Sequence, residues 1–138
     1  MFSRTSIVEF IKKNCFKGRQ KSFNFTNEAI EEYINWAFCN NYLLALAEND
    51  KLMSVLVVYP IQKNPEQIID LLPSDNDKSE NNICLMDFIA NSKTSRQKMT
   101  KLFMKTYPNW KNQNKWAIRN DKIVSLNNKY IELVGGLL

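Results

Sequence analysis

The run from Leu52 to Tyr59, with the sequence LMSVLVVY, is apolar at almost every position. A strand with one face in water alternates apolar and polar residues, whereas a strand that is apolar on both faces lies in a sheet that is covered on both sides. The run Tyr42–Ala47 is also strand-like, and Glu48–Lys51 joins the two runs through Asn-Asp, which is typical of a hairpin turn. The sequence therefore predicts a long hairpin inside a layered structure.

Two segments before this hairpin have the apolar spacing of amphipathic helices. In Ser6–Phe16 the apolar residues recur at intervals of three and four. The second helix is expected to begin at Thr26 or Asn27, either of which can cap it, and to end at Asn40-Asn41. Its apolar positions have helical spacing and predict a face that packs on a large apolar surface: Ile30, Tyr33, Ile34, Ala37 and Phe38.

The stretch from Ile83 to Tyr107 predicts a strand, a loop and a helix in succession. Ile83–Ala90 is nearly continuous in apolar residues, and the helix is expected from Ser95 to Tyr107, because Pro108 disfavours its continuation. A helix N-terminus has unpaired N–H groups and the positive end of the helix dipole, so it attracts anions. The alternative is a plain connection with a serine cap. The predicted phosphate-binding loop consists of Asn91, Ser92, Lys93, Thr94, Ser95 and Arg96.

The remaining segments predict shorter elements. Pro65–Leu72 is expected to form one or two helical turns, and a tight turn is expected at Asn127-Asn128. Three short strands are expected near the end of the sequence, at Lys115–Arg119, Ile123–Leu126 and Tyr130–Val134. Without a repeat or a linker, residues 1–138 are predicted to form a single domain of the α+β class (mixed α/β), with a central mixed sheet and helices on both faces.

The composition excludes several classes of site. The chain has no histidine, which rules out Cys/His zinc sites, Ser–His and Cys–His nucleophilic pairs and histidine acid–base chemistry, and no metal is expected. The separated Cys15, Cys39 and Cys84 are typical of reduced thiols in a cytoplasm. The net charge of +5 includes no block of five like charges and no recurring Lys/Arg helix face, so nucleic-acid binding is not favoured. No segment resembles a signal peptide or a membrane span, so we expect a soluble cytoplasmic protein.

The order of these elements resembles the GNAT N-acyltransferase fold over most of the chain. In that family the long hairpin corresponds to Tyr42–Tyr59, the central strand to Ile83–Ala90, and the loop that receives the pyrophosphate of acyl-CoA to Asn91–Arg96. The resemblance is one of element order and hydrophobic pattern. It implies that acetyl-CoA or another acyl-CoA is bound at this loop, and that the acceptor is a small-molecule or protein amine.

Two departures from the family pattern bear on activity. The segment Ser92–Lys98 has no glycine where the family has a glycine-rich loop, and Arg119 leads almost directly into Asp121-Lys122, where the family usually has a helix. Small GNAT-like proteins with such reductions occur among bacteriophage proteins, where the protein would act in the host cytoplasm or in the virion. The chain is therefore either an acyltransferase-like enzyme or a non-catalytic phage structural or host-interaction protein on the same scaffold, with a protein partner in a viral assembly.

Direct acyl transfer to an amine needs a base for the amine proton and an acid for the leaving thiolate. Asp87 is the candidate base, because it interrupts an apolar strand where a charge is costly unless it is paired or used. Its alternative role is a structural hydrogen bond or an exposed position at a strand edge. Tyr130 is the candidate acid, and its alternative role is ordinary packing. Cys84 is interpreted as a core residue.

A third hypothesis concerns Trp110–Trp116, which interleaves aromatic, basic and amide side chains. This composition can stack on single-stranded nucleic acid and hydrogen-bond to it. It also describes a surface loop that leads into a half-buried strand, and this second interpretation is the one we favour.

Overall fold

The computed structural model of the protein describes residues 3–15, 27–61, 64–71, 81–119 and 122–138. In these residues one sheet has the strand order β1-β2-β3-β4-β5, in which β3 and β4 are parallel and all other neighbours are antiparallel. The main elements are, in chain order, α1 (Arg4–Cys15), α2 (Asn27–Cys39), β1 (Leu43–Glu48), β2 (Lys51–Ile61), β3 (Asn82–Ala90), α3 (Lys93–Thr106), β4 (Asn114–Arg119), β5 (Lys122–Leu126) and α4 (Asn128–Val134).

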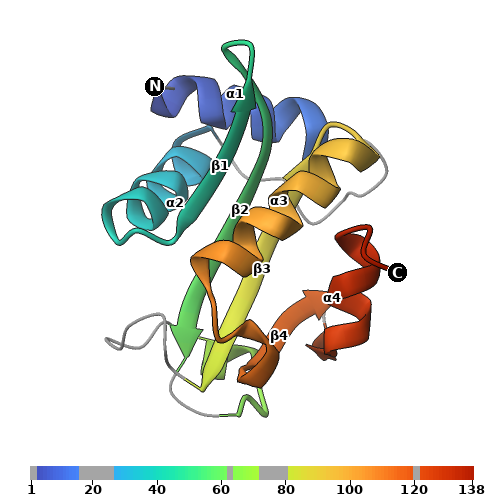
Figure 1. The fold of residues 1–138 in the computed structure, drawn as a ribbon. Coiled ribbons are helices and arrows are strands. Elements are labelled where there is room, and N and C mark those ends of the chain that lie inside the picture. Colours follow the sequence, from blue (N-terminus) through green and yellow to red (C-terminus); the bar gives the residue numbers. More distant parts are fainter. Residues whose placement is uncertain (1–2, 16–26, 62–63, 72–80, 120–121) are drawn as a thin grey trace.

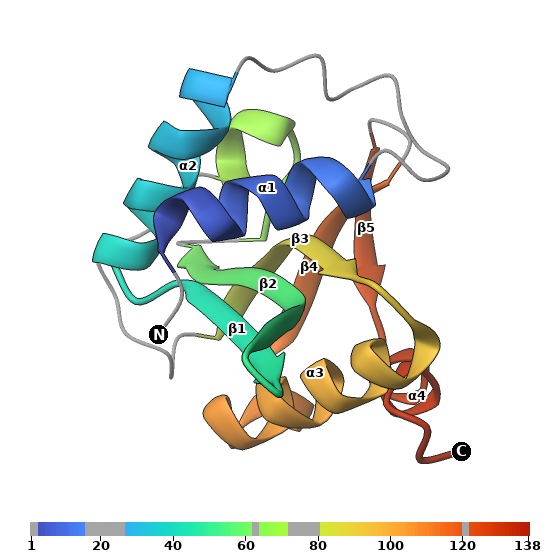
Figure 2. The same cartoon turned by 90° about the horizontal axis from the view of Figure 1, so that it is seen from above.

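Helices cover both faces of the sheet (Figure 1). Figure 2 shows α1 and α2 on one side and α3 and α4 on the other. Neighbouring residues of a strand point to opposite faces. Accordingly, Val55 of β2 belongs to the same buried cluster as Ile34 of α2, whereas Leu56 belongs to the cluster that contains Phe103 of α3. The predicted α+β class, with a mixed sheet between two helical layers, is confirmed.

The predicted hairpin is present as β1 and β2. Strand β2 is buried from Ser54 to Ile61, as expected for a strand with cover on both sides. The turn places Asn49 and Asp50 at φ values of 53° and 62°. Two successive left-handed residues form the type I′ turn that matches the twist of a hairpin, and asparagine and aspartate tolerate that conformation better than most residues. The turn chemistry in the sequence was therefore sufficient to locate the hairpin.

The predicted helices also form, with small shifts at their ends. Helix α2 begins at Asn27, and the alternative cap at Thr26 lies outside the described residues. Helix α3 begins at Lys93 rather than Ser95, because Ser92 is its N-cap and accepts a hydrogen bond from the Ser95 N–H group. The segment predicted to form one or two helical turns contains a 3₁₀ helix at Ile68–Leu71, and a second 3₁₀ helix lies at Trp110–Asn112.

The prediction of a strand at Tyr130–Val134 after a tight turn at Asn127-Asn128 is wrong. These residues form α4, and Asn127 is its N-cap: the side-chain oxygen accepts a hydrogen bond from the Tyr130 N–H group at 2.7 Å. So short an apolar run fits the residue spacing of a strand and of a helix equally well. The hydrogen bond from the capping asparagine stabilises the helix. The helix packs Ile131 into the core, with 4% of that residue exposed.

We expect Asn127→Ala to lower the free energy of unfolding by about 1 kcal/mol, because the substitution removes the cap of α4. Urea denaturation measures this loss. The matched control is Lys129→Ala, which changes an exposed residue in the first turn of the same helix and leaves the cap intact. Equal stability of the two variants would contradict the role given to Asn127.

None of the helices in the described ranges is long and apolar enough to cross a bilayer. Within the same ranges, His, Cys, Asp and Glu side chains form no group of three or more that could hold a metal ion.

Candidate functional site

Strands β3 and β4 pair only at one end. Their parallel ladder contains Asn82–Asn114, Ile83–Lys115 and Cys84–Trp116, although β3 has nine residues and β4 has six. In Figure 1 the two strands lie side by side at the lower end of the sheet, and β4 then runs toward α4. Beyond Cys84, the edge of β3 that faces β4 therefore pairs with no other strand among the residues that the structure describes. Backbone groups at such an edge are free to bind another molecule.

A β-bulge lies just beyond the last of these pairs. Val57 of β2 pairs with Asp87 and Val58 pairs with Leu85, so Met86 is an extra residue in β3. A bulge of this kind bends the strand and re-aims the side chains around it. Here the residue after the extra one is Asp87, whose side chain points to the α2 side of the sheet.

Asp87 is partly buried and accepts a hydrogen bond from a tyrosine of α2. The Tyr33 hydroxyl donates to Oδ2 of Asp87 at 2.5 Å. Burial raises the pKa of Tyr33 far above its ordinary value, and the negative charge of Asp87 raises it further, so Tyr33 keeps its proton and stays a donor. The structure thus shows the structural hydrogen bond that the sequence analysis gave as the alternative role of Asp87. A carboxylate held in this way can still accept a proton.

Aromatic side chains surround this hydrogen bond on the α2 side. The ring of Tyr33 is stacked with that of Trp36, with centroids 5.8 Å apart and an angle of 21° between the planes. Trp36 also contacts Tyr42 and Tyr59, at centroid distances of 5.4 and 5.5 Å. Cys84 lies in the same region, and burial raises its pKa to about 11. The thiol is therefore protonated at neutral pH, in agreement with its interpretation as a core residue.

The predicted phosphate-binding loop divides into capping residues and exposed residues. The Ser92 side chain caps the Ser95 N–H group at 3.1 Å, and the Ser95 hydroxyl donates to Asn91 Oδ1 at 2.7 Å. Ser95 is only 2% exposed. Its hydroxyl and N–H group are therefore already used within the loop, and its role as a donor to a phosphate stays a prediction.

Lys93, Thr94 and Arg96 are exposed residues of this loop whose side chains do not form the cap. The side chains of Lys93 and Arg96 have no ion-pair partner among the described residues. By the geometry of a helix, the N–H groups of Lys93 and Thr94 have no acceptor within α3. Two cations and two free N–H groups at the positive end of a helix dipole favour an anion here.

Tyr130 lies on the opposite side of the sheet from Asp87. Its ring packs against the core cluster under α3, and its hydroxyl accepts a hydrogen bond from Arg119 Nη2 at 2.6 Å. The Arg119 guanidinium also lies 5.0 Å from the centre of the Tyr130 ring. Because arginine only donates, the Tyr130 hydroxyl keeps its own proton for another acceptor. Nothing in the sequence indicates Tyr33 or Arg119 as partners of the two candidate residues, because the members of each pair come from different elements.

The end of α4 packs closely on α3. Gly136 has a φ of 75°, and the Leu137 N–H group donates to Glu132 O, which is the hydrogen bond of a Schellman motif. A Cβ atom at Gly135 would lie 3.2 Å from Thr100 Cγ2, and one at Gly136 would lie 2.9 Å from Gln97 Cδ. The side of α3 that follows the predicted phosphate-binding loop is therefore in contact with α4.

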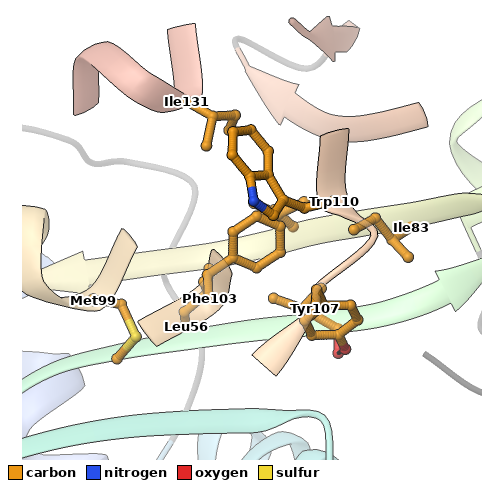
Figure 3. Close-up of a cluster of buried hydrophobic side chains, with 9 residues drawn as sticks. Leu56, Ile83, Met99, Phe103, Tyr107, Trp110 and Ile131 are labelled. Atoms are coloured by element: carbon orange, nitrogen blue, oxygen red, sulfur yellow. Dashed lines mark hydrogen bonds between the residues drawn. The ribbon is translucent and has the colours of Figure 1, made fainter. Parts of the chain in front are cut away.

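Trp110 is a core residue. Figure 3 shows its indole between Ile131 and Phe103, and 6% of the residue is exposed. Lys115 is also buried: its ammonium donates to the carbonyls of Trp110 and Gln113 at 2.6 and 2.7 Å, and burial lowers its pKa. Trp116 donates through Nε1 to Asn82 Oδ1 at 3.1 Å. Trp110 is thus part of the core and not of a surface loop, and its buried ring is not available to stack on a base.

Comparisons with known proteins identify the fold of the protein. No protein-family profile and no curated protein matches the sequence. The structure is similar to the crystal structure of the loading GNATL domain of CurA from Lyngbya majuscula, with a TM-score of 0.54 and 13% sequence identity over 83% of this chain. The matched part is 59% of the length of that chain. The protein therefore has a GNAT-like fold.

Proposed function

We propose that the protein is an acyl-CoA-dependent N-acyltransferase, reduced in its phosphate-binding loop. The observation that carries this proposal is the separation of β3 and β4 beyond Cys84 and Trp116, next to a helix N-terminus with free cations. An unpaired strand edge can hydrogen-bond an extended amide chain, and the N-terminus of α3 can bind its phosphates. The GNAT-like fold supports the same assignment at the level of architecture.

Lys93 and Arg96 would hold the phosphates, together with the N–H groups of Lys93 and Thr94. These groups fit a diphosphate in charge and in donor type. The absence of glycine between Ser92 and Lys98 leaves side chains where a loop of glycines would let the backbone approach. The chain therefore offers a binding site that depends on side-chain charge more than on a backbone nest.

An acyl-CoA would supply an activated thioester at the gap between the strands. The amine nitrogen attacks the thioester carbonyl carbon, and the Asp87 carboxylate takes the proton that the nitrogen loses. The carbon–sulfur bond breaks, and the thiolate takes its proton from the Tyr130 hydroxyl. Asp87 and Tyr130 lie on opposite sides of the sheet. This mechanism therefore requires the thioester to lie within the gap between β3 and β4, with the acceptor amine on the Asp87 side and the sulfur on the Tyr130 side. The acceptor is an amine of a small molecule or a protein.

A second candidate function is a non-catalytic protein on the same scaffold, as in a phage assembly. The contact of Gly135 and Gly136 with α3 favours this candidate, because it occupies a side of α3 close to the phosphate-binding loop. The glycine-free loop favours it as well. A cytoplasmic location and a phage origin remain predictions from the sequence.

Acetyl-CoA should raise the melting temperature of the protein, since a ligand that binds the folded state stabilises it by mass action. We expect the double variant Lys93→Ala/Arg96→Ala to weaken acetyl-CoA binding by more than about tenfold, because it removes two charge-assisted phosphate contacts. Titration calorimetry at fixed salt measures the affinity.

The matched control is Lys101→Ala/Lys105→Ala, which removes two exposed charges from the same helix away from its N-terminus. This control should keep the affinity within about twofold, since exposed charges beyond the first turn are screened by salt. Equal losses in both double variants would assign the effect to net charge. No binding by the unaltered protein would leave the non-catalytic candidate.

A further inference from the structure

Tyr33 reaches from α2 to the only acidic side chain of β3. The two residues are 54 positions apart in the sequence, and their hydrogen bond of 2.5 Å joins α2 to the sheet. We propose that Tyr33 is a positioning residue that fixes the Asp87 carboxylate for proton transfer from the acceptor amine. This inference rests on the proposed function.

The geometry of Tyr33 suits this role. Its ring is stacked on Trp36, which contacts Tyr42 and Tyr59 in turn, so the phenol has a fixed direction. The hydroxyl occupies one of the roughly four lone-pair sites of a carboxylate, which leaves the group able to take a proton. A base held by a packed neighbour needs no reorientation before the reaction.

The tyrosine also stays a donor at neutral pH. Burial and the charge of Asp87 keep its proton in place, so its hydrogen bond always favours the ionised carboxylate. Tyr59 and Cys84 also interact with this pair, and burial raises the pKa of both, so both are neutral at physiological pH. Among these groups, Asp87 is therefore the one that changes its charge during turnover.

The position of Asp87 in β3 favours a role in proton transfer over a purely structural role. It follows the bulge at Met86, in the part of β3 that lies beyond the last described pair with β4. Holding α2 on the sheet does not require a charged residue, because Ile34 of α2 and Val55 of β2 already pack in one apolar cluster. A carboxylate in this strand carries a desolvation cost that an apolar residue would avoid.

The test compares Tyr33→Phe with Tyr42→Phe, which removes a hydroxyl from the same aromatic cluster but not from Asp87. Acetyl-CoA is the donor, and the acceptor is whichever of a set of polyamines, amino acids and lysine peptides gives the fastest thiol release. We expect Tyr33→Phe to lower kcat by about ten- to a hundredfold with KM for the amine and Kd for acetyl-CoA within about twofold. Tyr42→Phe should match the unaltered protein.

A double variant separates positioning from support. If Tyr33 acts through Asp87, then Tyr33→Phe in an Asp87→Asn background lowers kcat no further than Asp87→Asn alone. The inference is overturned by an unchanged kcat in Tyr33→Phe, by equal losses in Tyr33→Phe and Tyr42→Phe, or by additive losses in the double variant. If Tyr33→Phe does not fold, Asp87→Glu is the alternative variant, because it keeps the charge but displaces it from Tyr33. An undiminished kcat in Asp87→Glu would also overturn the inference. Failure of the unaltered protein to bind acetyl-CoA is a separate result, which removes the proposed function itself.

Discussion

Asp87→Asn should lower the rate of acyl transfer by about 100- to 10,000-fold, the usual contribution of a positioned general base. The amide keeps the shape of the side chain and an oxygen that can accept the hydrogen bond from Tyr33, so the fold should be preserved. The amide cannot take a proton from the amine at neutral pH. The affinity for acetyl-CoA should stay within about twofold, because the phosphates are assigned to the N-terminus of α3. Thiol release and calorimetry measure the two quantities.

Asp50→Asn is the matched control for this substitution. Asp50 is an exposed carboxylate in the turn between β1 and β2, where asparagine also tolerates the left-handed conformation. This variant should keep the full rate. If Asp87→Asn retained the same rate as the control, Asp87 would be a structural acceptor for Tyr33, and the base would have to be sought elsewhere.

The largest effect on stability is expected at Phe103, at the centre of the cluster shown in Figure 3. The residue is 1% exposed and packs against Tyr107, with ring centroids 5.3 Å apart. Phe103→Ala removes the ring and leaves a cavity, which costs about 3–5 kcal/mol of unfolding free energy. Urea denaturation, followed by circular dichroism, measures the loss.

Phe38→Ala removes the same ring from a different environment. The sequence placed Phe38 on the apolar face of the second helix, but the residue is 49% exposed at the end of α2. Its substitution should therefore change the unfolding free energy by no more than about 0.5 kcal/mol. A comparable loss at the two positions would mean that the cluster beneath α3 is not the main core of the protein.

The parts of the fold that the sequence predicted are those with local determinants. The turn at Asn49 and Asp50, the two-faced apolar run of β2 and the strand, loop and helix from Ile83 to Tyr107 each depend on residues close in sequence. The strand predicted at Tyr130–Val134 failed for the opposite reason. Only the cap at Asn127 distinguishes the helix, and asparagine pairs are also common in turns.

Individual residues of the candidate site could be predicted from the sequence, but their partners could not. An acidic residue in an apolar strand drew attention to Asp87, but its partner Tyr33 fitted the apolar spacing of the second helix and gave no separate signal. Serines in a loop before a helix can cap it or bind an anion, and only the structure shows that Ser92 and Ser95 serve the cap. The pattern of Trp110–Trp116 was polar and aromatic, yet tertiary packing buried Trp110.

The short ladder between β3 and β4 has a mechanical consequence. Across every other strand junction of the sheet, directional backbone bonds along most of the shorter strand set the spacing. Past Cys84, that spacing is maintained by side-chain packing, in which Ile131 of α4 shares a cluster with Leu85 of β3. Packed side chains adjust to a change in volume by small shifts. Strands joined by backbone hydrogen bonds keep a fixed spacing unless those bonds are broken. The width of the gap between β3 and β4 therefore depends on the volume of the side chains beneath α4. Substitutions among these side chains could widen or narrow the gap in evolution while the strands stay unchanged.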